Sequence, residues 1–161
     1  MFQIISLIVI AALTVIDRIT KIAVVRTIKV TGSKEIIPGV LRLNYTENTG
    51  AAFSIFSDNT AALTLFTVLV IVLCLAVLLM RKTKSKFASA CLILIVSGGI
   101  GNEIDRIAHG FVVDFIEPLF VDFAVFNFAD ICITVGAFLL VGYEIYGMIT
   151  ERRQNRNKKD D

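Results

Sequence analysis

Residues 61–80 limit the possible folds of this chain more than any other stretch, because they contain no charged side chain. A helix needs about 20 predominantly apolar residues to cross a hydrocarbon core of about 30 Å. Hydrophobic residues also make up 56% of the 161 positions, above the roughly 45–50% of soluble domains. The sequence therefore predicts a membrane protein, organised as a single membrane-embedded domain over 1–161.

Three further apolar segments approach the same length, so we expect a bundle of four transmembrane helices. The third segment ends in small residues, which let neighbouring helices approach closely. The predicted helices cover about 2–25, 61–80, 87–104 and 126–149.

Basic residues predict the orientation of this bundle. They gather in the loop at 81–86 and in the polar tail at 151–161, and basic residues near membrane ends favour the cytoplasmic side. Both termini are then cytoplasmic, and the segments 26–59 and 103–125 face outward. The net charge is only +2, and the basic residues form no face along a phosphate backbone, so we expect no nucleic-acid partner.

The first outward segment has the pattern of a small sheet. Residues 41–46 alternate between apolar and polar side chains, which is typical of strands, and Gly32 and Pro38-Gly39 are turn signals. A lone hairpin is only marginally stable in water, so the β-like segment at about 27–57 should lie on the bilayer surface or on the helices. The predicted fold class is all-α membrane protein with a small β element.

Asp130 is one candidate catalytic residue, because it lies in an apolar stretch at the predicted outer end of the fourth helix. An ionisable residue within a membrane segment is costly and commonly functional. A carboxylate that caps the backbone amides of the first helical turn is the structural alternative. Asn127 lies three residues earlier, so its side chain should share a helix face with Asp130.

Asp114 is the second candidate, since apolar residues flank it on both sides within an outward segment. A capping or surface aspartate is the alternative here. Two carboxylates that meet can share one proton, because like charges a few ångströms apart are not both ionised cheaply. One can then act as base on a water and the other as acid on a peptide carbonyl, so this chemistry needs no metal and no cofactor. A single histidine, His109, excludes an HExxH zinc site.

Other polar residues are expected to support the candidate site. Asp17 and Lys21 are four residues apart on the first helix, where they can form a structural ion pair. The run at 101–106 ends the third predicted helix with acidic and basic side chains that can fix the loop carrying Asp114. Asn48 and Gly50 have the residue types of a turn, which would return the sheet to the second helix.

Four sequence blocks together resemble the signal peptidase II family, also called the lipoprotein signal peptidases. The resemblance spans nearly the whole chain, and the order and spacing of the blocks make it specific. One local departure is Glu103, where many relatives carry an apolar residue, and the sequence assigns no role to this acid. The blocks are residues 17–21, NTGAAF at 48–53, GNEIDR at 101–106 with VVDF at 112–115, and FNFAD at 126–130.

The resemblance implies an aspartic endopeptidase of the bacterial cytoplasmic (inner) membrane, with its active site toward the outer face. It would remove signal peptides from prolipoproteins that carry diacylglycerol, with Asp114 and Asp130 as the catalytic dyad. The outer sheet would be the family's cradle on the membrane surface, and membrane lipids and inhibitory cyclic peptide antibiotics would be further partners. The residues that would bind substrate or support the dyad are Asn48, Gly50, Asn102, Asp105, Arg106, Asn127 and Ala129.

Two other functions stay open at the level of the residues. A proton- or ion-coupled small membrane carrier is the alternative to the peptidase, because Asp130 and the pair of Asp17 and Lys21 can form a relay. Four spans without a detectable inverted repeat argue against a carrier. A non-catalytic membrane scaffold is the third possibility, in which neutralising both candidate aspartates changes only assembly or stability.

Overall fold

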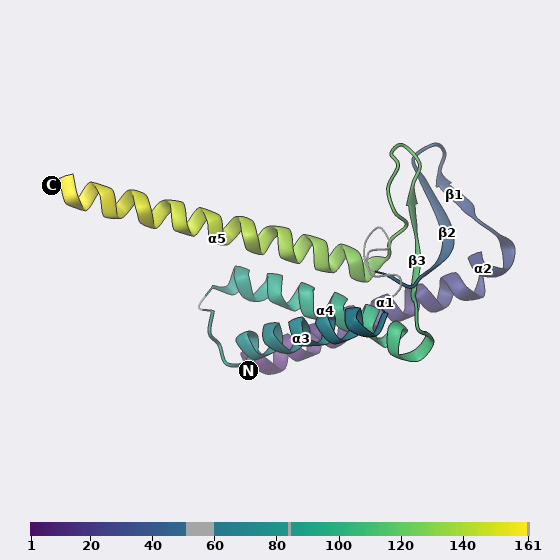
Figure 1. Cartoon of the computed structure of the whole chain (residues 1–161), viewed down its shortest axis with the longest axis horizontal. Helices are drawn as coiled ribbons and strands as arrows, with labels where there is room; N and C mark the ends of the chain where they lie inside the picture. The colour runs from purple at the N-terminus through teal and green to yellow at the C-terminus, as the bar shows by residue number, and fades with distance from the viewer. Residues whose placement is uncertain (51–59, 84, 161) are drawn as a thin grey trace.

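The fold is a helical bundle with a small sheet at one end, seen in a computed structural model that describes residues 1–50, 60–83 and 85–160 (Figure 1). Within these ranges, four helices are long and apolar enough to cross a membrane. The prediction of four membrane helices with a small β element is confirmed. The helices are α1 (Phe2–Arg26), α3 (Thr60–Leu79), α4 (Lys86–His109) and α5 (Phe128–Asp160), and a short helix α2 (Ile28–Thr31) follows α1.

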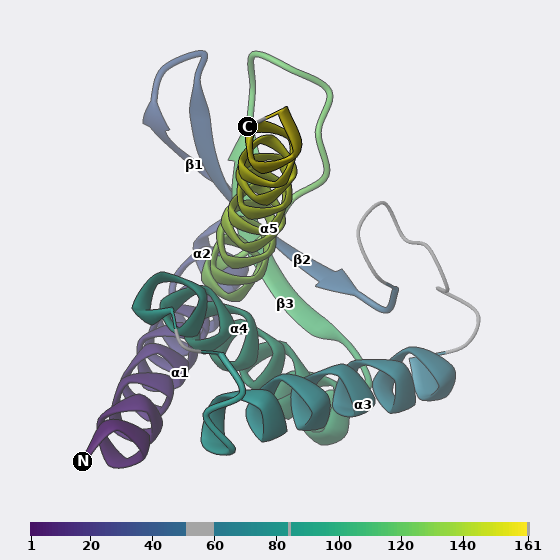
Figure 2. The same cartoon turned by 90° about the vertical axis from the view of Figure 1, so that its left-hand side faces the viewer.

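Helix α4 is the centre of the bundle and its most buried span. It packs against α5, α3 and α1; in Figure 2, α1 lies to its lower left and α3 runs across the lower part of the view. A β-carbon at Gly98 would lie 2.3 Å from the carbonyl oxygen of Ala129 on α5, a distance that real contacts do not reach. Gly98 therefore permits the close approach of α4 and the first turn of α5.

The sheet has three antiparallel strands in the order β1 (Lys34–Ile37), β2 (Leu41–Asn48) and β3 (Val112–Pro118). Its inner face joins the end of α1 and the short helix α2 through a cluster of Val24, Ile28, Val113 and Phe115. In Figure 1 the sheet stands at one end of the bundle and both chain termini lie toward the other end. Strand β3, which follows α4 in the chain, thus lies beside β2, which precedes α3.

Strand β3 was not expected, since the sequence indicated only an outward segment at 103–125. The alternation that reveals a half-buried strand is missing here, because Val112, Val113, Asp114 and Phe115 are all buried. A strand covered on both faces shows a continuous apolar run. The carboxylate of Asp114 lies inside that run and is 2% exposed, so the alternative of a surface aspartate is wrong.

Two helix ends also differ from the prediction. Helix α4 continues to His109 rather than ending near 104, and it stops at Gly110, whose left-handed φ of 79° caps it through a 2.9 Å bond from Gly110 N to Arg106 O. Helix α5 begins at Phe128 rather than 126 and continues to Asp160 through the expected tail. At 1.5 Å per residue its 33 residues span about 50 Å, more than the apolar core of a bilayer.

Parts of three predicted segments lie outside the described residues. These are residues 51–59, which include the end of the β-like segment and the motif residues Ala51, Ala52 and Phe53, together with Lys84 and Asp161.

Candidate active site

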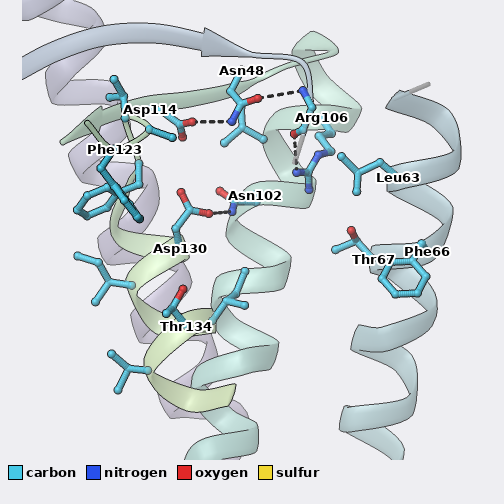
Figure 3. Close-up of a pocket in the computed structure, with 18 residues that line it drawn as sticks. Asn48, Leu63, Phe66, Thr67, Asn102, Arg106, Asp114, Phe123, Asp130 and Thr134 are labelled. Carbon is cyan, nitrogen blue, oxygen red and sulfur yellow. Dashed lines mark hydrogen bonds between the residues drawn. The ribbon is translucent and has the colours of Figure 1, made fainter. Parts of the chain in front are cut away.

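A cavity of about 530 Å³ opens where the sheet meets α3, α4 and α5. Its walls are mainly apolar, and Figure 3 shows the charged and amide side chains toward its sheet end, with Thr67 and Thr134 further down the helices. Both candidate aspartates line it, and so do three of the predicted supporting side chains. The polar side chains that line the cavity are Asn48, Thr67, Asn102, Arg106, Asp114, Asp130 and Thr134.

Asp130 is held by the first turn of α5. Its backbone N–H donates to Asn127 Oδ1 at 2.9 Å, and its Oδ2 accepts from Asn127 N at 3.0 Å. This is the reciprocal arrangement of a capping box, so the capping alternative is correct for one carboxylate oxygen. The other oxygen, Oδ1, accepts from Asn102 Nδ2 at 2.7 Å, and the residue lines the cavity. Capping therefore orients Asp130 without removing it from the site.

Asp114 is held by two asparagine amides. Asn48 Nδ2 donates to its Oδ2 at 2.9 Å, and Asn127 Nδ2 donates to its Oδ1 at 2.7 Å. Burial, and next the charge of Asp130, raise the pKa of Asp114 to about 7, against the smaller lowering effect of the two amides and of Lys21. A carboxyl group with this pKa is about half protonated at pH 7, whereas one with an ordinary pKa is almost fully ionised there.

The two aspartates are linked through Asn127, although they come from different elements. Asn127 Nδ2 also lies 3.0 Å from Asn102 Oδ1, so the amides bridge β3, α4 and α5. Figure 3 shows Asp114 and Asp130 one above the other on the same wall of the cavity. Such a pair of neighbouring carboxylates, one of which retains its proton, can activate a water and polarise a carbonyl.

A buried ionic cluster supports the site from behind. Lys21 Nζ lies 2.9 Å from Asp17 Oδ2 and 3.1 Å from Asp105 Oδ2, and it donates to Asn102 Oδ1 at 2.9 Å. Arg18 also pairs with Asp105. The predicted pair of Asp17 and Lys21 is thus part of a larger cluster that holds Asn102 toward Asp130.

The same cluster fixes the backbone beside both aspartates. Asp105 Oδ2 accepts from Val113 N at 3.2 Å, next to Asp114. Asp17 Oδ1 accepts from Ala129 N at 3.1 Å, next to Asp130. Ala129 itself is fully buried, and its role in the structure is this backbone bond.

Asn48 and Gly50 form the predicted turn. Gly50 N donates to Asn48 Oδ1 at 2.9 Å, an Asx-type turn, and Arg106 Nη2 lies 3.4 Å from the Gly50 carbonyl oxygen. This turn directs the Asn48 amide toward Asp114 (Figure 3).

Sequence reasoning missed the side chains from α3 and the deeper part of α5 that line the cavity. Thr134 follows Asp130 by four residues, so helical spacing was a usable signal for it. Leu63, Phe66 and Thr67 on α3 carried no such signal, because an evenly apolar helix does not reveal which face meets a site. His109 is exposed and stacks on Phe111 at 5.7 Å between ring centroids.

The described ranges contain no group of three or more histidine, cysteine, aspartate or glutamate residues arranged to hold a metal ion. The polar side chains that line the cavity are carboxylates, amides, hydroxyls and the Arg106 guanidinium.

Four membrane-length helices and a cavity lined by two carboxylates define a multi-pass membrane protein with the groups of an aspartic hydrolase. The family described as signal peptidase (SPase) II matches residues 9–146. A lipoprotein signal peptidase of Streptococcus thermophilus (strain CNRZ 1066) is 46% identical over 132 residues, which cover 82% of this chain and 86% of the relative. One of Streptococcus pyogenes serotype M5 (strain Manfredo) is 43% identical over 138 residues, covering 86% and 89%.

Two solved structures have a similar fold. A bacterial membrane enzyme determined at 2.3 Å resolution superposes with a TM-score of 0.82 at 28% identity, over 89% of this chain and 88% of the other. A second, at 1.9 Å, gives a TM-score of 0.75 at 30% identity over 84% and 89%. The chain belongs to the signal peptidase II family. The prediction of a bacterial multi-pass membrane hydrolase of this type is confirmed, in preference to a carrier or a scaffold.

Proposed function

We propose that this protein removes signal peptides from diacylglyceryl-modified prolipoproteins, with Asp114 and Asp130 activating the water that attacks the scissile peptide bond. The observation that carries the proposal is the pair of carboxylates facing one cavity, one of them with a pKa of about 7. The names of the similar streptococcal proteins support the substrate class.

In this mechanism Asp130 is the base and Asp114 the acid. Asp130 takes a proton from the attacking water while the water oxygen bonds to the carbonyl carbon. The protonated Asp114 donates a hydrogen bond to the carbonyl oxygen, where negative charge develops. The carbon–nitrogen bond then breaks, and Asp130 returns the proton to the leaving nitrogen. The raised pKa of Asp114 supports its assignment as the protonated member.

The surrounding amides preorganise this chemistry. Asn48, Asn102 and Asn127 donate to the two carboxylates at 2.7–2.9 Å, so neither carboxylate has to reorient when substrate binds. Fixed hydrogen bonds in a site that excludes bulk water stabilise a developing charge more than water does.

The apolar walls fit a substrate that the bilayer already holds. Leu63 and Phe66 on α3 and Ile133 and Val135 on α5 line the cavity beside the aspartates, where an apolar signal helix and acyl chains can pack. Membrane lipids would surround this opening, and cyclic peptide antibiotics with apolar side chains are proposed to occupy the same cavity.

We place the site at the outer face of the cytoplasmic (inner) membrane, with both termini in the cytoplasm. The basic residues Arg81 and Lys82, and Arg152 and Arg153 in the last part of α5, support this orientation through the positive-inside rule. The sheet, whose strands β2 and β3 carry Asn48 and Asp114, lies at the opposite end of the bundle from both termini.

The experiment that tests the function uses one precursor peptide in lipidated and unlipidated forms. The purified protein in lipid nanodiscs is mixed with each form, and the released signal segment is measured by mass spectrometry. Cleavage confined to the lipidated form is the expected result. Equal cleavage of both forms would contradict the proposed substrate, and no cleavage of either would contradict the proposed activity.

A further inference from the structure

Glu103 is a buried acid that the proposed chemistry does not use. Its side chain is 6% exposed and lies 3.5 Å from Arg106 Nη1, one helical turn further along α4, whose side chain is 8% exposed. Among the described residues, Glu103 is not part of the cavity wall, whereas Arg106 is. Any effect of Glu103 on the reaction must therefore pass through another residue.

The pair also has polar atoms without partners. Glu103 Oε1 and Arg106 Nε are both buried and accept or donate no hydrogen bond in the described part of the chain. An unpaired buried polar atom is unfavourable, and each such atom in a native structure calls for an explanation.

A continuous series of contacts leads from Glu103 to Asp114. Arg106 Nη2 donates to the Gly50 carbonyl oxygen at 3.4 Å, and Gly50 N donates to Asn48 Oδ1 at 2.9 Å. Asn48 Nδ2 then donates to Asp114 Oδ2 at 2.9 Å. Figure 3 shows Asp114, Asn48 and Arg106 following one another along the sheet end of the cavity.

We propose that Glu103 is a positioning residue, which holds the Arg106 guanidinium against the Asn48–Gly50 turn and thereby keeps the Asn48 amide on Asp114. A guanidinium without a fixed partner has many rotamers, so it would support the Gly50 carbonyl only part of the time. The carboxylate of Glu103 removes this freedom and neutralises a buried positive charge. This inference rests on the proposed function, because it assigns the effect to Asp114.

The test compares Glu103→Gln, Glu103→Asp and wild type on the lipidated precursor. We expect Glu103→Gln to lower kcat about tenfold, in the range measured for coupled neighbours, with KM within about twofold because Glu103 does not reach the cavity. Glu103→Asp keeps the charge and should recover part of the loss. Glu144→Gln, a change of an exposed glutamate on α5, is the matched control and should leave kcat and KM unchanged.

A second arm uses Arg106→Lys, whose ammonium lacks the planar fork that contacts both Glu103 and Gly50. If Glu103 acts through Arg106, adding Glu103→Gln to this variant should change kcat less than twofold. The proposal is overturned if Glu103→Gln keeps kcat within twofold of wild type. It is also overturned if Glu103→Gln lowers kcat by the same factor in the wild-type protein and in Arg106→Lys. Absence of wild-type turnover would instead count against the proposed function itself.

Discussion

Asn127 donates its side-chain amide to Asp114 Oδ1 at 2.7 Å, and the same residue caps the helix that carries Asp130. One side chain thus fixes the relative position of two carboxylates that are sixteen residues apart in sequence. Asn127 itself does not ionise, but it holds the two carboxylates that are proposed to transfer the proton.

The dual role of Asn127 can be separated by substitution. Asn127→Ser keeps a good helix cap but cannot reach Asp114, whereas Asn127→Ala removes both functions. Because Asp114 acts in its protonated, neutral form, and a neutral hydrogen bond contributes about 0.5–1.5 kcal/mol, both variants should lose about two- to tenfold in kcat. Only Asn127→Ala should also lower the thermal unfolding midpoint, by the equivalent of about 1 kcal/mol. Wild-type kcat in Asn127→Ser would contradict the bridging role.

The activity of the wild-type protein should fall as the pH rises through about 7. Asp114 must keep its proton to act as the acid, and its pKa is about 7. The measured value will belong to the pair rather than to one residue, since two coupled carboxylates titrate together. Initial rates of cleavage at saturating substrate between pH 5 and 9 test this. An activity that stays flat to pH 9 would exclude Asp114 as the acid.

The same pKa predicts how stability depends on pH. Asp114 is protonated in the folded state up to about pH 7, while in the unfolded state it loses its proton near its ordinary value of 3.8. Between these values the folded state binds more protons, so the contribution of Asp114 to stability is full below about pH 4 and is lost as the pH rises to 7. Replacing Asp114 by asparagine should flatten the free energy of unfolding over this window, as measured by reversible unfolding in detergent.

Asn48 should affect the pKa of Asp114, the proposed acid. The hydrogen bond from its side-chain amide favours the charged form of the Asp114 carboxyl group and so lowers the pKa of Asp114. Asn48→Ala should therefore shift the alkaline limb of the pH–rate profile to higher pH while lowering kcat. Asn44→Ala is a suitable comparison, because it changes an asparagine on the same strand that does not line the cavity. A shift to lower pH in Asn48→Ala would contradict this hydrogen bond.

Close packing at Gly98 can be tested with a pair of glycines. Gly98→Ala would place a β-carbon 2.3 Å from the Ala129 carbonyl oxygen, whereas nothing lies within 4 Å of a β-carbon at Gly142. Forced overpacking costs about 1–3 kcal/mol, and here it would move the turn that carries Asp130. Gly98→Ala should lose both stability and activity, while Gly142→Ala should keep both. Equal behaviour of the two variants would show that α4 and α5 can separate freely.

The sequence predicted the membrane helices well, because twenty-residue apolar runs have few structural alternatives. It did not predict β3, since a strand buried on both faces shows no alternation at Val112–Pro118. It also indicated the ion pair of Asp17 and Lys21 from helical spacing. The contacts of Lys21 with Asp105 and Asn102 depend on the packing of α1 against α4, which local patterns do not encode.

The sequence indicated candidate residues for the site but not the contacts between them. Asp114 and Asp130 stood out because charge is rare in apolar surroundings. That Asn127 would join them required the bridge between Ile116 of β3 and Phe126, the residue before Asn127. A tertiary arrangement of this kind follows from the whole fold rather than from any one motif.

The most direct test of the central claim is the single-turnover rate of lipidated-precursor cleavage in Asp114→Asn and Asp130→Asn. Each variant keeps the shape of its side chain but loses one proton-transfer group, so each should lower the rate by at least about a hundredfold. Asp122→Asn, in the exposed segment between β3 and α5, should cleave at the wild-type rate. Cleavage within tenfold of wild type by either dyad variant, correctly inserted in the membrane, would contradict the account.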